Sequence, residues 1–249
     1  MRKNPGLGNQ PYLRIDMSLL GTAALAMWWN IAPEVRPEFE HWHSHEHFPE
    51  RLGIPGFRRG SRWRSATGGQ AIFVMYELES YAVLSSEHYL ARLNAPTPWS
   101  TKMMPHHRDM VRSQSHVLES LGGSVAAYAL TVRLSPQAGG ESELQASLRS
   151  LMSTLVIRPG LTGAHLLKHE TPPIAQTTEQ KIRGASDRTA DWVIVACGYD
   201  RPALEDLGKG DFGAPALTKL GAADQQICEL FALSYSSVPA DFHQVPGRP

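Results

Sequence analysis

The chain has 249 residues with 24 basic and 24 acidic side chains, so its formal net charge is zero, and neither nucleic acid nor an anionic membrane is expected as a partner. This length is enough for one large domain or two small ones with buried cores. The two cysteines, Cys197 and Cys228, are too few for a disulfide scaffold, which favours a cytoplasmic protein.

Residues 1–16 are expected to form a flexible leader, with Met17 as an alternative start. The basic opening and the apolar run after it loosely resemble an export signal. The run is too short to cross a membrane, however, and it continues into Trp28 and Trp29 without a cleavage site of small residues. We therefore interpret its end, residues 25–31, as the first strand.

The order of elements in the first half predicts a ferredoxin-like unit. Pro33 and Pro37 open a helix that ends near Leu52, before the Gly and Pro of "GIPG". Further elements are predicted as strands at 57–64 and 71–78, a short helix at 85–94 capped by Ser85 or Ser86, and a fourth strand at 113–121. The resulting β-α-β-β-α-β order is the ferredoxin-like motif.

The second half repeats this order. Its predicted elements are strands at 126–134, 158–168, 191–200 and 225–235 and a helix at 141–157. The Pro55-Gly56 pair returns as Pro159-Gly160 after the matching helix, and a longer polar loop occupies residues 171–190. We therefore predict an α+β protein in which two tandem ferredoxin-like repeats, residues 17–122 and 123–240, form an intrachain α/β barrel.

One stretch of the first repeat, "EFEHWHSHEHFPERLGIPGF" at residues 38–57, resembles the first helix of the EthD-like dimeric α+β barrel proteins. The family pattern of an aromatic pair, a histidine, a proline and a Pro-Gly falls on Phe39, Trp42, His47, Pro49 and Pro55-Gly56. The resemblance covers roughly residues 25–120, and the second repeat has no counterpart of His47. It implies that the first repeat is the active half. The functions in this family are mixed: polyketide cyclases, cofactor-free monooxygenases, haem-handling enzymes and isomerases.

Four histidines in this stretch cannot all bind one ion, because residues four apart share a helix face. That spacing places His43 with His47, and His41 with His45 on the solvent side. His43 and His47 could bind zinc with a third ligand, although Ser44 stands where metalloprotease helices carry a glutamate. His47 is either an acid/base group beside a pocket or a structural histidine at the helix end.

Residues 93–113 are a second stretch in which polar residues gather. The segment is predicted to be a long loop that either wraps the barrel end or forms a wall of the pocket, where His106 or His107 and Arg108 would polarise a carbonyl or a carboxylate. Strand alternation puts Trp28 and Asn30 on one face. Glu77, among apolar neighbours, needs a partner such as Arg62 or Arg64, or a wet pocket.

These observations predict a small-molecule enzyme of lyase, isomerase or cyclase type, without cofactor or metal, that uses acid/base chemistry on an apolar, carbonyl-bearing and aromatic compound. The alternatives are a protein that binds a hydrophobic ligand or haem without turnover, and a His-ligated metal enzyme. The predicted catalytic residues are His47, His106 and Arg108, and the predicted substrate-binding residues are Trp28, Asn30, His43, Glu77, Trp99 and His107. Exposed strand edges or helix faces favour a further homodimer.

Overall fold

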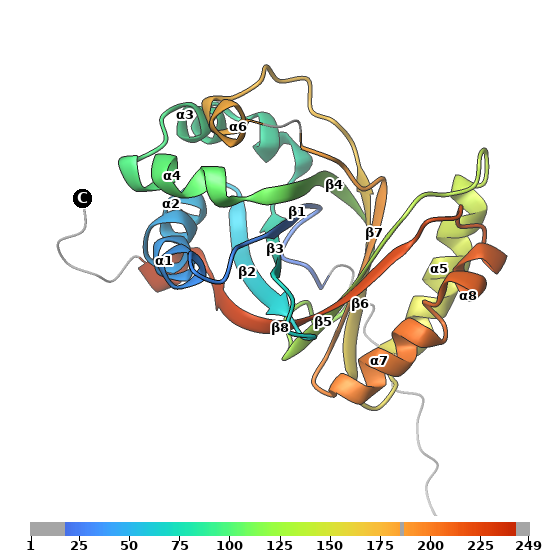
Figure 1. The fold of residues 1–249 in the computed structure, drawn as a ribbon. Helices are drawn as coiled ribbons and strands as arrows, with labels where there is room; N and C mark the ends of the chain where they lie inside the picture. Colours follow the sequence, from blue (N-terminus) through green and yellow to red (C-terminus); the bar gives the residue numbers. More distant parts are fainter. Residues whose placement is uncertain (1–17, 185–186, 243–249) are drawn as a thin grey trace, which may run out of the picture.

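Eight strands form one closed barrel in the computed structural model, which describes residues 18–184 and 187–242 (Figure 1). The strands are β1 Ala23–Asn30, β2 Phe57–Ser65, β3 Ala71–Leu78, β4 Arg108–Gly122, β5 Tyr128–Leu134, β6 Leu161–His169, β7 Trp192–Gly198 and β8 Ile227–Ser237. Around the barrel they follow the order β1-β3-β2-β8-β5-β7-β6-β4, with every neighbouring pair antiparallel. The predicted leader and the alternative start at Met17 lie outside the described residues.

The barrel consists of two ferredoxin-like units, as the tandem pattern predicts. Strands β1 to β4 come from the first half and β5 to β8 from the second, and the last strand of each half crosses over: β4 pairs with β6, and β8 pairs with β2. The predicted boundary falls between the end of β4 at Gly122 and the start of β5 at Tyr128. A closed barrel leaves no free sheet edge within these eight strands.

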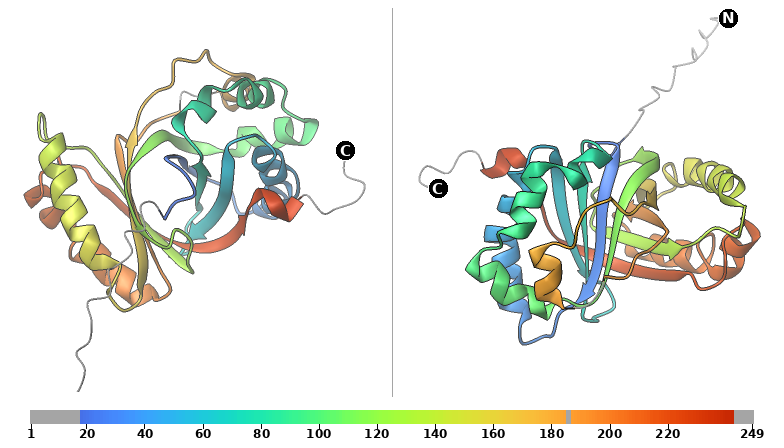
Figure 2. Two further views of the ribbon diagram at one scale, coloured as in Figure 1. Left: turned by 180° about the vertical axis from the view of Figure 1, so that it is seen from behind. Right: turned by 90° about the horizontal axis from the view of Figure 1, so that it is seen from above.

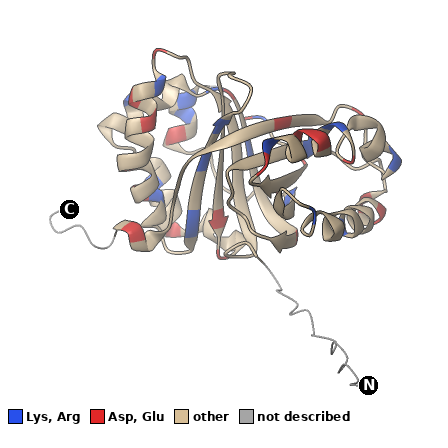
Figure 3. Ribbon diagram, turned by 90° about the horizontal axis from the view of Figure 1, so that it is seen from below, with Lys and Arg blue, Asp and Glu red and all other residues tan. Residues whose placement is uncertain are grey.

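Helices cover the outside of each half. They are α1 Arg36–Trp42, a π-helix His43–His47, α2 Phe48–Leu52, α3 Glu87–Asn94, α4 Pro98–Met103, α5 Glu141–Leu155, α6 Thr178–Arg183, α7 Arg201–Lys209 and α8 Ala214–Lys219, with short 3-10 turns at Tyr81–Ser85, Met104–His106 and Pro239–Phe242. Figures 1 and 2 show α5, α7 and α8 over the second half, whereas α6 crosses to the first half and lies beside α3. Acidic and basic residues are interspersed over the helices of both halves (Figure 3). Within the described residues, no helix is both long and apolar enough to cross a bilayer.

The two faces of the first-half sheet pack into different hydrophobic cores. Leu25, Met27 and Trp29 point outward and join the core under α1 and α2, while Trp28 and Phe73 point into the barrel. The rings of Trp28 and Phe73 stack 5.0 Å apart. The indole of Trp28 also donates to the hydroxyl of Thr131, 3.2 Å away in the second half. The barrel interior is therefore packed with side chains, and the expectation that Trp28 faces a substrate pocket is wrong.

Glu77 points into the same interior and has a different partner from the two arginines proposed for it. The ladder between β2 and β3 shifts register between Phe57 and Arg59, which places Arg59 opposite Glu77. The Arg59 guanidinium lies 3.2 Å from the Glu77 carboxylate, which also accepts hydrogen bonds from the Leu20 amide and the Ser124 hydroxyl. Arg62 lies on the opposite face of the strand. The register shift, which strand alternation cannot reveal, decides the pairing.

Several predicted loops contain helical turns. The segment 93–113 holds α4, the turn Met104–His106 and the start of β4, and the polar segment 171–190 holds α6. The helix expected from Pro33 to Leu52 begins at Arg36 and is interrupted by the π-helix. Helix α3 begins after Ser86, whose hydroxyl accepts from the Tyr89 amide, so Ser86 and not Ser85 is the cap.

Candidate functional site

The π-helix turns two of the four clustered histidines into the protein. Its backbone has the wider repeat of a π turn, in which the Phe48 amide donates to the His43 carbonyl five residues earlier. His43 and His47 are consequently both buried, with 1% and 9% of their surface exposed. His41 and His45 lie on the exposed side, as helix spacing predicts. A π turn within a helix is frequently found at a functional site.

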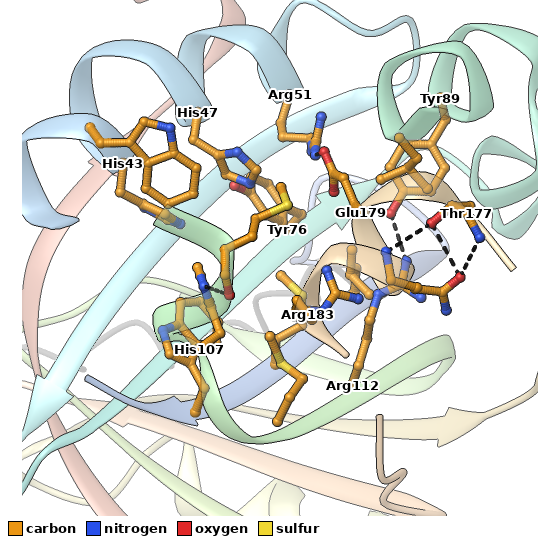
Figure 4. A pocket seen from close by; sticks show the side chains of 18 residues that line it. His43, His47, Arg51, Tyr76, Tyr89, His107, Arg112, Thr177, Glu179 and Arg183 are labelled. Carbon is orange, nitrogen blue, oxygen red and sulfur yellow. Dashed lines mark hydrogen bonds and ion pairs between the residues drawn. The ribbon is translucent and has the colours of Figure 1, made fainter. Parts of the chain in front are cut away.

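A small cavity lies between these histidines and the outer face of the first-half sheet (Figure 4). It is lined by Leu25, Met27, Trp29 and Tyr76 of the sheet, Trp42, His43, His47 and Arg51 of the π-helix and its flanking helices, Tyr89 and Leu93 of α3, Met104 and His107, Met110 and Arg112 of β4, and Thr177, Glu179, Gln180 and Arg183 of the second half. Its volume is about 40 Å³, enough for one or two water molecules. The segment around α6, which contributes Thr177, Glu179, Gln180 and Arg183, therefore closes a site whose other walls belong to the first half.

Burial keeps the cavity histidines neutral. Loss of solvent is the main cause that lowers the pKa of His43 and of His47 well below the ordinary range, and the neighbouring charge of Arg51 lowers that of His47 further. The Nδ1 atoms of both rings are buried and have no hydrogen-bond partner among the described residues. The ring centres lie 5.1 Å apart. At neutral pH, both imidazoles are proton acceptors.

His107 reaches the same cavity from the turn that precedes β4. Its Nδ1 lies 3.1 Å from the Met104 carbonyl, which can only accept, so Nδ1 carries the proton and Nε2 has the free lone pair. Burial, together with the nearby charge of Arg183, lowers the pKa of His107 to about 3. A third neutral imidazole therefore lines the cavity.

Charged groups on the other side of the cavity come from both halves. Arg51 of α2 forms an ion pair with Glu179 of α6, and both side chains are about 95% buried, with 4% and 5% exposed. Arg183 pairs with Asp187 at 2.8 Å, and Arg112 donates to the Tyr89 hydroxyl at 2.8 Å. Arg51 and Arg183 are each paired with a carboxylate, so among the described residues the uncompensated positive charge of this wall is that of Arg112, which favours a ligand that carries or develops negative charge.

The structure brings three of the nine predicted site residues together: His43, His47 and His107 line the cavity. Helix geometry explains the group, because the π turn directs the first two inward and the turn after α4 directs the third.

The other predicted residues lie elsewhere. Asn30 is bound to Asp109 at 2.9 Å at the rim of the barrel. Arg108 donates to Gln70 near the surface. His106 and Trp99 do not line the cavity, and Trp99 packs against the outside of the core, with its ring 5.3 Å from His41. With Trp28 and Glu77 inside the barrel, these placements correct the expectation that all nine residues surround one pocket.

Sequence reasoning missed the charged half of the site. Arg51 was within reach, because it lies four residues after His47 and such residues share a helix face. Arg112 lies on β4, one residue before the predicted fourth strand at 113–121. No sequence signal indicates that Glu179 and Arg183 of the second repeat contact the first.

The described residues contain no group of three His, Cys, Asp or Glu side chains arranged to hold a metal ion. The two inward histidines have arginines beside them, and in the part of the chain that the structure describes no carboxylate or thiol completes a ligand set with them, so the lining does not fit a metal ion.

No protein-family model and no curated protein matches the chain. Solved structures do match over most of its length. A candidate monooxygenase from Lactobacillus acidophilus is 8% identical, with 88% of this chain and 97% of that chain covered at a TM-score of 0.55. One from Fusobacterium nucleatum is 7% identical, with coverage of 88% and 96% and a TM-score of 0.58.

An anthrone oxidase-like protein is 11% identical, with 90% of this chain and 96% of that chain covered at a TM-score of 0.60. At such identities the likeness concerns the fold, and the narrower EthD-like resemblance stays a prediction from the sequence. The protein has the ferredoxin-like fold of the dimeric α+β barrel proteins, with both units of the barrel in one chain.

Proposed function

We propose that the protein is an enzyme that transfers a proton on a small, largely apolar, carbonyl-bearing compound, with His47 as the general acid/base. The observation that carries this proposal is the buried, neutral imidazole of His47, whose Nδ1 has no hydrogen-bond partner among the described residues, in a cavity beside three arginines. A general base must be unprotonated and must reach the substrate, and His47 meets both requirements.

The proposed step is removal of a proton from the carbon next to the carbonyl group. The electron pair of the C–H bond moves into the carbonyl group and gives an enolate or, in an aromatic system, a phenolate. His47 holds the proton and can return it at another position. In this proposal, the arginines that line the same cavity stabilise the negative charge that develops on oxygen. This step requires no nucleotide or flavin.

His47 is a better candidate for the base than its two neighbours. His43 is almost completely buried and packs against Phe39 and Phe48, with ring centres 5.1 and 4.6 Å away. His107 donates through Nδ1 to the Met104 carbonyl and offers Nε2 alone. In this proposal His43 positions His47, and His107 contacts the substrate.

The lining supports an apolar and aromatic substrate. Trp29, Trp42 and Met104 face the cavity together with Leu25 and Met27, and aromatic rings bind against such surfaces. A volume of about 40 Å³ is much smaller than an aromatic molecule, so substrate binding requires the segment around α6 to move away from α2. Haem is larger still and would require more displacement.

The fate of the enolate distinguishes the reaction types. Return of the proton gives an isomerase, bond cleavage or ring closure gives a lyase or cyclase, and transfer of electrons to O₂ gives an oxidase or monooxygenase. The similarity in fold to candidate monooxygenases and to an anthrone oxidase-like protein makes O₂ consumption the first fate to test.

The experiment follows proton exchange and does not require the natural substrate. Anthrone and a panel of aromatic β-diketones are incubated with the protein in D₂O, and NMR measures incorporation of deuterium next to the carbonyl while an electrode measures O₂. We expect His47→Gln to lower the exchange rate about 10²–10⁴-fold, the usual contribution of a general base. His41→Ala, on the exposed side of the same helix, is the matched control and should keep the wild-type rate.

Two outcomes would contradict the proposal. If His47→Gln unfolds the protein while the rate per folded molecule is unchanged, His47 is a structural residue of the helix end. If the compounds bind without exchange or turnover, the protein is a hydrophobic-ligand carrier, and a Soret band in the purified protein would identify haem as the ligand. The cytoplasmic location and the homodimer stay predictions, the latter to be tested by light scattering.

A further inference from the structure

One buried cation beside the candidate active site has no anionic partner in the described part of the chain. Arg112 is 7% exposed, and its guanidinium donates to the Tyr89 hydroxyl. Among residues 18–184 and 187–242, no carboxylate lies within ion-pair distance of it, whereas Arg51 and Arg183 are both paired. A buried charge without a counter-charge is unfavourable. A bound anion would remove this cost.

Arg112 also lies between two cavities. It lines the histidine cavity on one side and, with Gln180, a second cavity of about 240 Å³ on the other. The second cavity is polar, with Gln114, His169 and Thr171 among its lining residues. Figure 4 shows Arg112 reaching from β4 toward Tyr89 below the segment around α6.

A second polar side chain in this cavity is buried and unpartnered. Gln114 is 6% exposed, and its amide Nε2 has no hydrogen-bond partner in the described part of the chain. This amide nitrogen can only donate. A guanidinium and an amide donor, two residues apart on the same face of β4, therefore line one cavity and both lack an acceptor with negative charge.

We propose that the second cavity is an anion subsite, in which Arg112 and Gln114 bind the carboxylate of a compound whose apolar, carbonyl-bearing part occupies the histidine cavity. This inference rests on the proposed function for the position of the apolar part. A guanidinium matches the two oxygens of a carboxylate and forms charge-assisted hydrogen bonds to them.

The charge of the cavity favours a single negative charge on the ligand. Its one carboxylate, Asp187, is engaged by the Arg183 guanidinium at 2.8 and 3.4 Å. One unpaired cation near an existing carboxylate can neutralise a carboxylate ligand. A phosphate dianion would leave negative charge uncompensated beside the Asp187 carboxylate.

The test compares three probes that share a phenyl ring and differ in their polar group: benzoate, the near-isosteric neutral benzamide, and phenyl phosphate, with affinities measured by calorimetry. The wild-type protein should bind benzoate at least about tenfold more tightly than benzamide, as expected for a hydrogen bond to a charged group. Arg112→Met should abolish this preference, and Gln114→Leu should reduce it.

The melting temperature separates a binding role of Arg112 from a structural one. Without ligand, Arg112→Met should melt at or above the wild-type temperature, because an unpaired charge is replaced by an apolar chain. The control is Arg62→Met: Arg62 is 3% exposed and has three hydrogen-bond partners, so its loss should lower the melting temperature. Benzoate should raise the melting temperature of the wild-type protein and of Arg62→Met, but not of Arg112→Met.

Three results would overturn the subsite: equal affinities of the wild-type protein for benzoate and benzamide, tighter binding of phenyl phosphate than of benzoate, or destabilisation by Arg112→Met as large as that by Arg62→Met. None of these results bears on whether His47 is the general acid/base. Conversely, His47→Gln should lose proton exchange and keep the preference for benzoate, so failure of the proposed function is recognised independently.

Discussion

The ion pair between Arg51 and Glu179 connects the segment around α6 to the first half, and its removal should open the site. Substitution Glu179→Gln keeps the shape of the side chain and removes its charge. Both side chains are about 95% buried, and deletion of one member of a buried pair typically costs about 3–5 kcal/mol. Glu50, 3.6 Å from Arg51, remains as a weaker partner, so we expect a loss near 3 kcal/mol.

The assay should locate this loss as well as measure it. Urea unfolding gives the free energy of unfolding, and hydrogen exchange followed by mass spectrometry reports on the peptide that contains residues 177–184. We expect faster exchange in that peptide with little change in the barrel strands. The double variant Arg51→Met, Glu179→Leu should recover most of the lost stability, because an apolar pair of similar volume replaces an ion pair.

The reasoning would be refuted if Glu179→Gln changed the free energy of unfolding by less than about 0.5 kcal/mol, the range of an ordinary surface substitution. It would also be refuted if the double variant lost as much as the sum of the single variants, since that result means the two side chains are not coupled.

Three further substitutions test other parts of the structure. His165 is fully buried in the barrel, and desolvation lowers its pKa to about 4 from 6.5. Between these two pH values the His165 side chain is protonated in the unfolded chain but not in the folded one. Lowering the pH from 7.5 to 5.0 should therefore lower the free energy of unfolding by about 2 kcal/mol through this group. His165→Gln should remove that share of the pH dependence in urea titrations, and an unchanged dependence would show that His165 is protonated in the folded state. Trp28→Phe should cost about 2 kcal/mol through lost packing and the lost bond to Thr131, but should leave KM unchanged; an increased KM would place Trp28 in the site after all. His41→Ala should change the free energy of unfolding by less than about 0.5 kcal/mol, and a larger loss would show that this exposed residue supports the helix.

The sequence predicted most elements of the barrel, because their signals are local. The run "AIFVMYEL" occupies β3 with the expected bounds, 71–78. Ser86 caps α3, one of the two candidates. The repeated order of elements predicted the tandem barrel, which the solved structures of the same fold confirm.

The candidate site was predicted only where one helix determines it. Spacing along that helix separated His43 and His47 from His41 and His45, and the structure places the first pair inward. The prediction failed on the strands, since both faces of β1 are apolar and alternation does not say which one meets the helices. Trp28 was assigned to the pocket and Trp29 was not, and the structure reverses this assignment.

The sequence by itself therefore determined the element order, the tandem repeat and the inward pair of histidines, because each depends on residues that are close in the chain. Only the tertiary structure decided that Glu179 of the second repeat pairs with Arg51 of the first, 128 residues earlier. It also decided that Arg112 is buried with no counter-charge among the residues that the structure describes. Both facts depend on how α6 and β4 pack against distant elements, and no local pattern of residue types records such contacts.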